Sequence, residues 1–137
     1  MRWLRRRIPK ETIILIDDTV FETVMGFAKE AYPNEAILLL RGKRDAEKVV
    51  LSEVVIPPLA THGDGFSSFN MHMLPADPSV MGVAHSHPSG VLRPSIQDLN
   101  IFYGRIMVIV AHPYLSVNNM AAFDHSGKRV RFEITRL

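Results

Sequence analysis

The sequence contains no cysteine. Disulfide frameworks, thiolate nucleophiles and cysteine-ligated zinc sites are therefore excluded. Any metal ion has to be held by histidine and carboxylate side chains, because these are the remaining strong ligands. The absence of cysteine also fits a protein of the reducing cytoplasm, which is where we expect this chain to act.

Long hydrophobic runs are also missing. The chain begins with a basic segment, residues 1–10, and such a start is typical of signal peptides. The apolar stretch at residues 12–16 is short and is followed directly by Asp17 and Asp18. A signal peptide needs about 7–15 apolar residues and a membrane span about 20. We therefore expect a soluble, unexported protein with a flexible, basic N-terminus.

The rest of the composition is that of one globular domain. A chain of 137 residues that is 47% apolar can bury roughly two-thirds of the surface that it exposes when unfolded. No repeat, linker or extended low-complexity tract divides it, so we expect residues 1–137 to form a single domain. The length excludes a large barrel of about 250 residues.

Apolar runs and helical patterns alternate along the chain. Strands are expected at residues 12–16, 36–40, 49–56, 69–73, 80–87 and 106–111. The run at 12–16 is either a first strand or the lead-in to a helix that begins near Val20 and ends before Pro33. The continuous run at 36–40 is typical of a strand buried on both faces.

The second half of the chain adds a short helix and a hairpin. The helix is expected at residues 95–103. Residues 120–123 and 130–134, separated by a turn at Gly127, predict a closing hairpin. The whole pattern indicates an α/β domain with a mixed sheet and two main helices.

Two histidines end the run at 80–87. At positions i and i+2 of a strand, the imidazoles of His85 and His87 lie on the same face, so both can reach one ion. Pro88 then ends the strand. This places the pair at the C-terminal end of a strand, where α/β sheets commonly bind ligands.

A carboxylate follows on the predicted second helix. Ser95 begins this helix and Asp98 lies one turn further along, on the same face. A helix that returned toward the strand would bring Asp98 to His85 and His87. Two imidazoles and one carboxylate leave the fourth position of tetrahedral zinc to water, which is typical of catalytic zinc. The sequence therefore predicts a catalytic Zn²⁺ site.

Such a site needs a proton acceptor. Glu35 precedes the buried run at 36–40, at the rim of the core, where a carboxylate can be held near its working pKa. Glu53 lies within another predicted strand and competes with Glu35 on composition alone.

The pattern Glu35 … His85-x-His87-Pro … Ser95-x-x-Asp98 resembles the JAMM/MPN+ metalloproteases in their minimal archaeal or bacterial form. The resemblance spans nearly the whole chain and includes Met73-Leu74-Pro75. It implies a cytidine-deaminase-like fold, with a mixed sheet sandwiched by helices, and isopeptidase activity on ubiquitin-like conjugates. It also implies roles. His85, His87 and Asp98 bind Zn²⁺, Glu35 is the general base and acid, and Ser95 stabilises the oxyanion.

Two features bear on the substrate. The segment His-Ser-His-Pro-Ser-Gly also resembles RadC-type relatives, but the helical region that precedes their domain has no room here. The long insertions with which larger deubiquitinases hold ubiquitin are missing as well. We expect an extended Gly-Gly tail to pair with an edge strand within residues 66–73.

Ordinary structural interpretations exist for each residue. Ser95-x-x-Asp98 alone is a helix capping box, and Glu35 alone is a solvated strand end. Their coincidence with a paired-histidine strand favours the metal site. Of the other histidines, His72 lies in a strand that we expect to border the cleft. None of them has a partner at ligand spacing: His62, His72, His112 and His125.

We therefore expect a zinc metalloprotease that cleaves after the C-terminal glycine of a ubiquitin-like or sulfur-carrier protein. One alternative is a non-catalytic scaffold of the same fold, although such members typically lose the ligands. The other is a RadC-like or nucleic-acid-associated module that uses the basic termini. DNA binding that depends on salt and needs no zinc would favour it.

Overall fold

An eight-stranded mixed sheet with the order β7-β6-β5-β4-β2-β3-β1-β8 forms the centre of the computed structural model, which describes residues 12–57 and 77–137. The strands are β1 (Ile13–Asp17), β2 (Ile37–Arg44), β3 (Lys48–Val55), β4 (Val80–His87), β5 (Ile106–Ala111), β6 (Met120–Asp124), β7 (Arg129–Val130) and β8 (Phe132–Thr135). The helices are α1 (Asp18–Ala31), α2 (Ile96–Asn100) and the 3₁₀ helix η2 (Val117–Asn119). The predicted α/β class and mixed sheet are confirmed.

Most elements lie where the hydrophobic pattern placed them. β4 and β5 have the predicted bounds, and residues 13–16 of the predicted run at 12–16 fall in β1, which leads directly into α1 at Asp18. The basic N-terminus, the predicted edge strand within residues 66–73 and residues 73–75 lie outside the described residues. Within the described ranges, no helix is long and apolar enough to cross a membrane.

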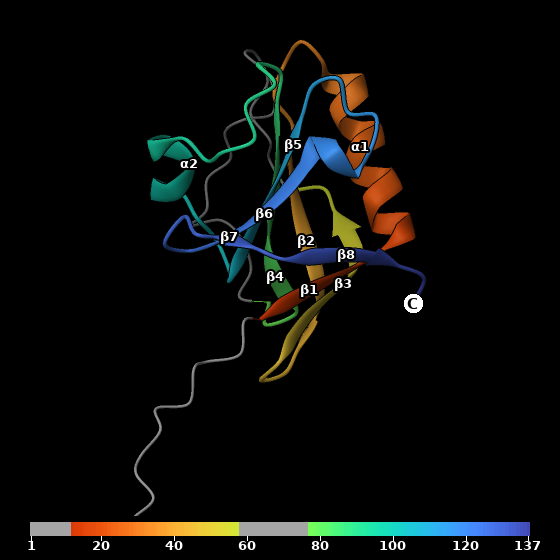
Figure 1. Ribbon diagram of the computed structural model, residues 1–137, viewed down its shortest axis with the longest axis vertical. Helices are drawn as coiled ribbons and strands as arrows, with labels where there is room; N and C mark the ends of the chain where they lie inside the picture. The colour runs from red at the N-terminus through yellow and green to blue at the C-terminus, as the bar shows by residue number, and fades with distance from the viewer. Residues whose placement is uncertain (1–11, 58–76) are drawn as a thin grey trace, which may run out of the picture.

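Side chains of the central strands alternate between two apolar clusters. Leu38 and Leu40 of β2 lie in the larger cluster, which also contains Val24 of α1. Leu39 points to the opposite face, into a smaller cluster with Val83 of β4. The larger cluster therefore lies between α1 and the sheet (Figure 1), and the predicted burial of residues 36–40 on both faces is present.

The helix α2 is shorter than predicted, because it ends at Asn100 instead of near residue 103. Ile101 has already left the helical conformation, with φ −110°. Phe102 and Tyr103 pack against the smaller apolar cluster on the sheet. Burial of the large aromatic rings favours this path over another helical turn.

The predicted closing hairpin is wrong in its second strand. β6 pairs antiparallel with β7, around a turn in which Gly127 has φ 83°, but β8 pairs in parallel with β1 at the other edge of the sheet. There, Phe132 and Ile134 pack against the larger cluster. Only Arg131 separates β7 from β8, so the sheet curls until one continuous segment joins its two edges (Figure 1).

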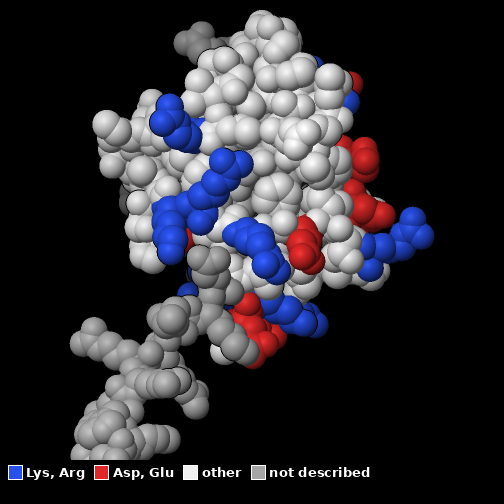
Figure 2. Space-filling model, in the orientation of Figure 1, with Lys and Arg blue, Asp and Glu red and all other residues white. Residues whose placement is uncertain are grey.

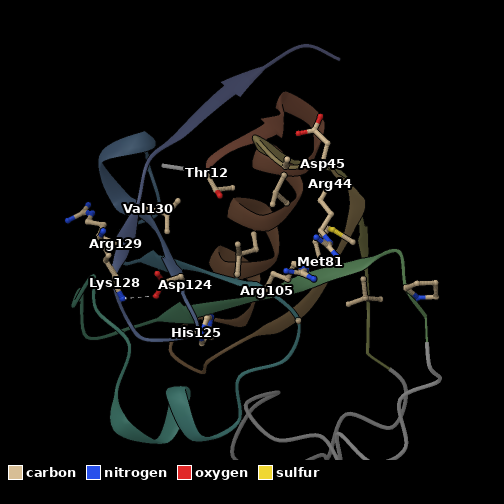
Figure 3. A pocket seen from close by; sticks show the side chains of 16 residues that line it. Thr12, Arg44, Asp45, Met81, Arg105, Asp124, His125, Lys128, Arg129 and Val130 are labelled. Atoms are coloured by element: carbon tan, nitrogen blue, oxygen red, sulfur yellow. Dashed lines mark hydrogen bonds between the residues drawn. The ribbon is translucent and has the colours of Figure 1, made fainter. Parts of the chain in front are cut away.

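A hollow of about 830 Å³ opens at the end of the sheet where β4 and β5 begin (Figure 3). Its lining includes four basic side chains, which are Arg44, Arg105, Lys128 and Arg129. Lys and Arg side chains gather on the lower part of the face in Figure 2, whereas its upper end carries few charged side chains. None of the residues predicted for the metal site lines this hollow, because they lie at the opposite end of β4.

Candidate metal centre

The last three residues of β4 form the base of the site. His85, Ser86 and His87 are 3%, 2% and 8% exposed, so both imidazoles leave water when the chain folds. Because side chains alternate along a strand, His85 and His87 share the face of Val83, in the smaller cluster. Ser86 points to the α1 side. The two histidines therefore have the shared face expected from their spacing.

Asp98 reaches both histidines from α2. Its Oδ2 atom lies 3.1 Å from His87 Nε2, and its Oδ1 atom lies 3.7 Å from His85 Nδ1. A capping box holds the carboxylate, since the Ser95 N–H donates to Asp98 Oδ2 at 2.8 Å and the Asp98 N–H donates to Ser95 Oγ at 3.0 Å. The predicted cap and the predicted return of the helix toward the strand are thus one arrangement.

A backbone carbonyl sets the orientation of His87. Its Nδ1 atom lies 2.8 Å from the Val91 carbonyl oxygen, which can only accept a hydrogen bond. We therefore assign a hydrogen to Nδ1, which donates it to that oxygen. In a neutral ring, Nε2 then carries a lone pair that faces the Asp98 carboxylate. A cation has to lie between them, either a proton or a metal ion.

The direction of the His87 pKa shift also favours a cation between His87 and Asp98. Burial lowers the pKa, but hydrogen bonds to Asp98 and Val91 outweigh it, so the pKa lies above its ordinary value. For Asp98, burial raises the pKa, yet the hydrogen bonds from His87 and Ser95 bring it down to about 2. Both shifts favour a proton on His87 in the metal-free protein, in the place that a metal ion would fill.

His85 is held as a neutral imidazole. Burial is the main cause that lowers its pKa to about 4. Its Nε2 atom is buried and has no hydrogen-bond partner in the part of the chain that the structure describes. Buried polar atoms are normally satisfied, and a neutral imidazole nitrogen is a good zinc ligand, so this orphaned atom suits a metal ion, although Nδ1 is the His85 nitrogen that Asp98 approaches.

The donor set of two imidazoles and a carboxylate therefore fits zinc. Across residues 12–57 and 77–137, no three His, Asp or Glu side chains are already spaced around an ion. Asp98 contacts His87 directly and approaches His85 closely. A bound ion has to separate the carboxylate from the two rings.

Glu35 lies opposite His87. β2 and β4 are antiparallel, with Ile37 opposite His85, and the Ser86 N–H donates to the Ala36 carbonyl at 3.0 Å. Continuing this register by one pair brings Glu35 to His87, on the same face of the sheet. Glu35 is partly buried. Burial is the main cause that raises its pKa, and the charge of Asp98 adds to it while that of His87 opposes it.

The other candidates lie elsewhere. Glu53 is in β3, where its exposed carboxylate pairs with Arg41 at 3.3 Å. His112 stacks on Tyr32 with ring centroids 4.3 Å apart, and His125 lines the hollow at the other end of the sheet. His62 and His72 lie outside the described residues.

The sequence reasoning missed two partners of the site. One is the Val91 carbonyl, for which no sequence signal exists, because any residue supplies a backbone oxygen. The other is Ser86, which the pattern passed over as the spacer between two histidines. Its position inside the motif was the available signal.

Known proteins with similar sequences include a JAB-domain family and a protein named as a metalloprotease. Residues 17–126 match the Prok-JAB family, described as prokaryotic homologs of the JAB domain. A protein of Haloferax volcanii named "Probable metalloprotease" is 39% identical over 136 residues, which cover 93% of this chain and 81% of that protein.

Solved structures of similar fold include two that share a quarter or more of the sequence. A JAB1/MPN domain protein from Archaeoglobus fulgidus is 32% identical with a TM-score of 0.67, covering 88% of this chain and 98% of that one. A structure described as "JAMM: A Metalloprotease-like Zinc Site in the Proteasome and Signalosome" is 29% identical with a TM-score of 0.66, covering 90% of this chain and 99% of the other. The chain therefore belongs to the Prok-JAB family, the prokaryotic homologs of the JAB domain.

Proposed function

We propose that this metalloprotease of the JAB family cleaves the peptide or isopeptide bond after the C-terminal glycine of a ubiquitin-like or sulfur-carrier protein. In this proposal one Zn²⁺ is held by His85, His87 and Asp98. The observation that carries it is the approach of Asp98 to both imidazoles, at 3.1 and 3.7 Å, with Glu35 opposite His87. When bound, zinc polarises a carbonyl and lowers the pKa of water.

Glu35 is the proposed proton carrier. It accepts a proton from the attacking water as the new carbon–oxygen bond forms, and returns a proton to the leaving amine as the carbon–nitrogen bond breaks. Partial burial supports this role, because it raises the pKa of the carboxyl above its ordinary value and toward neutral pH.

Ser95 is the proposed donor to the oxyanion. Its Oγ atom accepts the Asp98 N–H at 3.0 Å, a bond that uses a lone pair and leaves the hydroxyl hydrogen free for another acceptor. The exposed position of Ser95 at the start of α2 lets that hydrogen reach a substrate. Capping and oxyanion stabilisation therefore use different parts of one hydroxyl.

The burial of the histidines supports a glycine-ended substrate. His85 and His87 are nearly covered, so the reacting bond has to approach them through a restricted opening. A glycine backbone passes such an opening more easily than a residue with a side chain. The similarity to a JAMM zinc site described in the proteasome and signalosome also supports a protein conjugate as substrate.

A panel of fusions tests the proposal. Zinc-loaded protein is incubated with ubiquitin-like and sulfur-carrier proteins fused through a Gly-Gly tail, and with the same fusions ending in Gly-Val. We expect cleavage of the Gly-Gly tail to fall by about tenfold or more with valine, because one misfitting group in a close-packed site costs this much. Equal cleavage of both tails would overturn the glycine requirement.

The same panel separates the alternatives. Binding of the fusions without cleavage by zinc-loaded protein would favour a scaffold. DNA binding that weakens with salt and needs no zinc would favour a nucleic-acid module.

A further inference from the structure

Ser86 stands between the two proposed ligands but points away from them. Apart from the Tyr114 hydroxyl, the buried polar or charged side chains among the described residues are His85, Ser86, His87 and Asp98. Ser86 is the one member of this group that does not face the metal centre. Its side chain lies on the α1 face of the sheet, on the same side as Ala84.

The Ser86 hydroxyl replaces a backbone group in the β2–β4 ladder. The Ala36 N–H donates to Ser86 Oγ at 2.7 Å, and the Ser86 N–H donates to the Ala36 carbonyl at 3.0 Å. In a regular antiparallel pair, both bonds would join backbone groups. Here a side chain accepts one of them, and the pairing extends one residue before β2 begins at Ile37.

This pair of bonds fixes the peptide group next to Glu35. The Ala36 nitrogen belongs to the peptide unit that joins Glu35 to Ala36, so the hydroxyl sets the plane of that unit. In the described part of the chain, Ala36–Ser86 is the last hydrogen-bonded β2–β4 pair before Glu35, whose own N–H makes no backbone hydrogen bond there. The direction in which Glu35 leaves the sheet therefore depends on Ser86.

We propose that Ser86 is a positioning residue for Glu35, holding the Glu35–Ala36 peptide so that the carboxylate stays opposite His87. This inference rests on the proposed function, in which Glu35 moves the proton. Ser86 itself contacts neither the substrate nor the ion, because it lies on the other face of β4.

The kinetic test compares three variants of the zinc-loaded protein. Ser86→Ala removes the acceptor, Ser86→Thr keeps a hydroxyl, and Ser126→Ala removes a hydroxyl from the β6–β7 turn at the opposite end of the sheet. A misplacement of about 1 Å can cost roughly 10²-fold in rate. We expect Ser86→Ala to lower kcat by about tenfold or more with KM and zinc content unchanged, Ser86→Thr to restore most of the rate, and Ser126→Ala to match the wild type.

A second measurement does not depend on activity. In the metal-free protein, amide hydrogen exchange read by NMR should show faster exchange at Ala36 in Ser86→Ala than in the wild type. The amide of Leu39, inside β2, should keep its protection. If Ser86→Ala does not fold, Ser86→Cys serves in its place, because sulfur is of similar size but a weak acceptor.

Several results would overturn the positioning role. They are a wild-type kcat in Ser86→Ala or Ser86→Cys, unchanged protection of the Ala36 amide, or loss of zinc in either variant. The Glu35→Gln variant separates this failure from failure of the proposed function. If Glu35→Gln is inactive while Ser86→Ala is fully active, only the positioning role falls. If Glu35→Gln is fully active, both fall.

Discussion

The Asp98 carboxylate lies 3.1 Å from His87 Nε2, although Asp98 belongs to α2 and His87 ends β4. The Val91 carbonyl occupies the other ring nitrogen, so Nε2 is the one nitrogen that His87 can offer to an ion. The contact therefore has two uses. The raised pKa of His87 favours a protonated ion pair with Asp98 in the metal-free protein, and the same two groups are ligands in the proposed metal-bound protein, so protons and metal compete for them.

The first prediction concerns metal content. Purified protein should bind close to one zinc ion per chain, and His87→Ala should lose most of it, because a catalytic zinc site has only three protein ligands. Elemental analysis after dialysis measures this. His125→Ala, which removes a histidine from the β6–β7 turn, is the matched control and should keep its zinc. Full zinc occupancy in His87→Ala would show that the site is wrongly assigned.

The second prediction separates the base from the ligands. Glu35→Gln should keep the fold and the zinc but lower turnover by ~10² or more, since it removes proton transfer alone. Glu53→Gln removes a carboxylate that pairs with Arg41 on β3 and should leave turnover nearly unchanged. Steady-state kinetics and zinc analysis on both variants check this. Equal losses of rate in the two variants, or loss of zinc in Glu35→Gln, would contradict the proposed roles.

The third prediction uses two caps of the same kind. Ser95→Ala should lower the free energy of unfolding by about 1 kcal/mol, the usual cost of losing an N-cap, and should also reduce turnover. Ser116 accepts the Asn118 N–H at 3.2 Å at the start of η2, so Ser116→Ala should lose a cap and leave turnover unchanged. Urea denaturation and kinetics on both variants test this. Wild-type turnover in Ser95→Ala would limit Ser95 to capping.

The fourth prediction concerns the pH dependence of stability in the metal-free protein. The unfolded chain takes up a proton on His85 near pH 6.5, whereas folded His85 does so only near its pKa of about 4. The free energy of unfolding should therefore fall as the pH drops from 6.5 to 4, by about 3 kcal/mol from this group alone. His87 has a raised pKa and acts in the opposite sense above pH 6.5, where its stabilisation is lost as pH rises.

Chemical denaturation at several pH values measures this slope. His85→Gln cannot take up the proton, so its stability between pH 4 and 6.5 should change less than that of the wild type. An equal slope in both proteins would show that another group causes it.

The local parts of the site could be predicted because they depend on short spacings. His85 and His87 share a face at i and i+2 of a strand, and Ser95 and Asp98 form a cap at i and i+3. Glu35 could be proposed from its place before an apolar run and from the family resemblance, but its position opposite His87 follows from the register of β2 on β4.

The features that could not be predicted from the sequence depend on contacts between distant segments, such as the pairing of strands. Phe132–Thr135 has the same alternating pattern whether it pairs with β6 or with β1, so the hairpin prediction had no local signal against it. The bond from Ala36 to the Ser86 hydroxyl joins positions 50 residues apart and has no sequence periodicity. The end of α2 depended in the same way on burial of Phe102 and Tyr103 against distant residues.

The parallel pairing of β1 with β8 has a consequence for biosynthesis. The ribosome makes Asp17 long before Leu137, yet the Leu137 N–H donates to Asp17 Oδ1 across 120 residues of chain. After β3 has emerged and paired with one side of β1, the other side therefore stays unpaired until β8 follows. Until then, its row of free N–H and C=O groups can pair with other nascent chains, so this strand is the segment of the described fold that we expect chaperones to shield during translation.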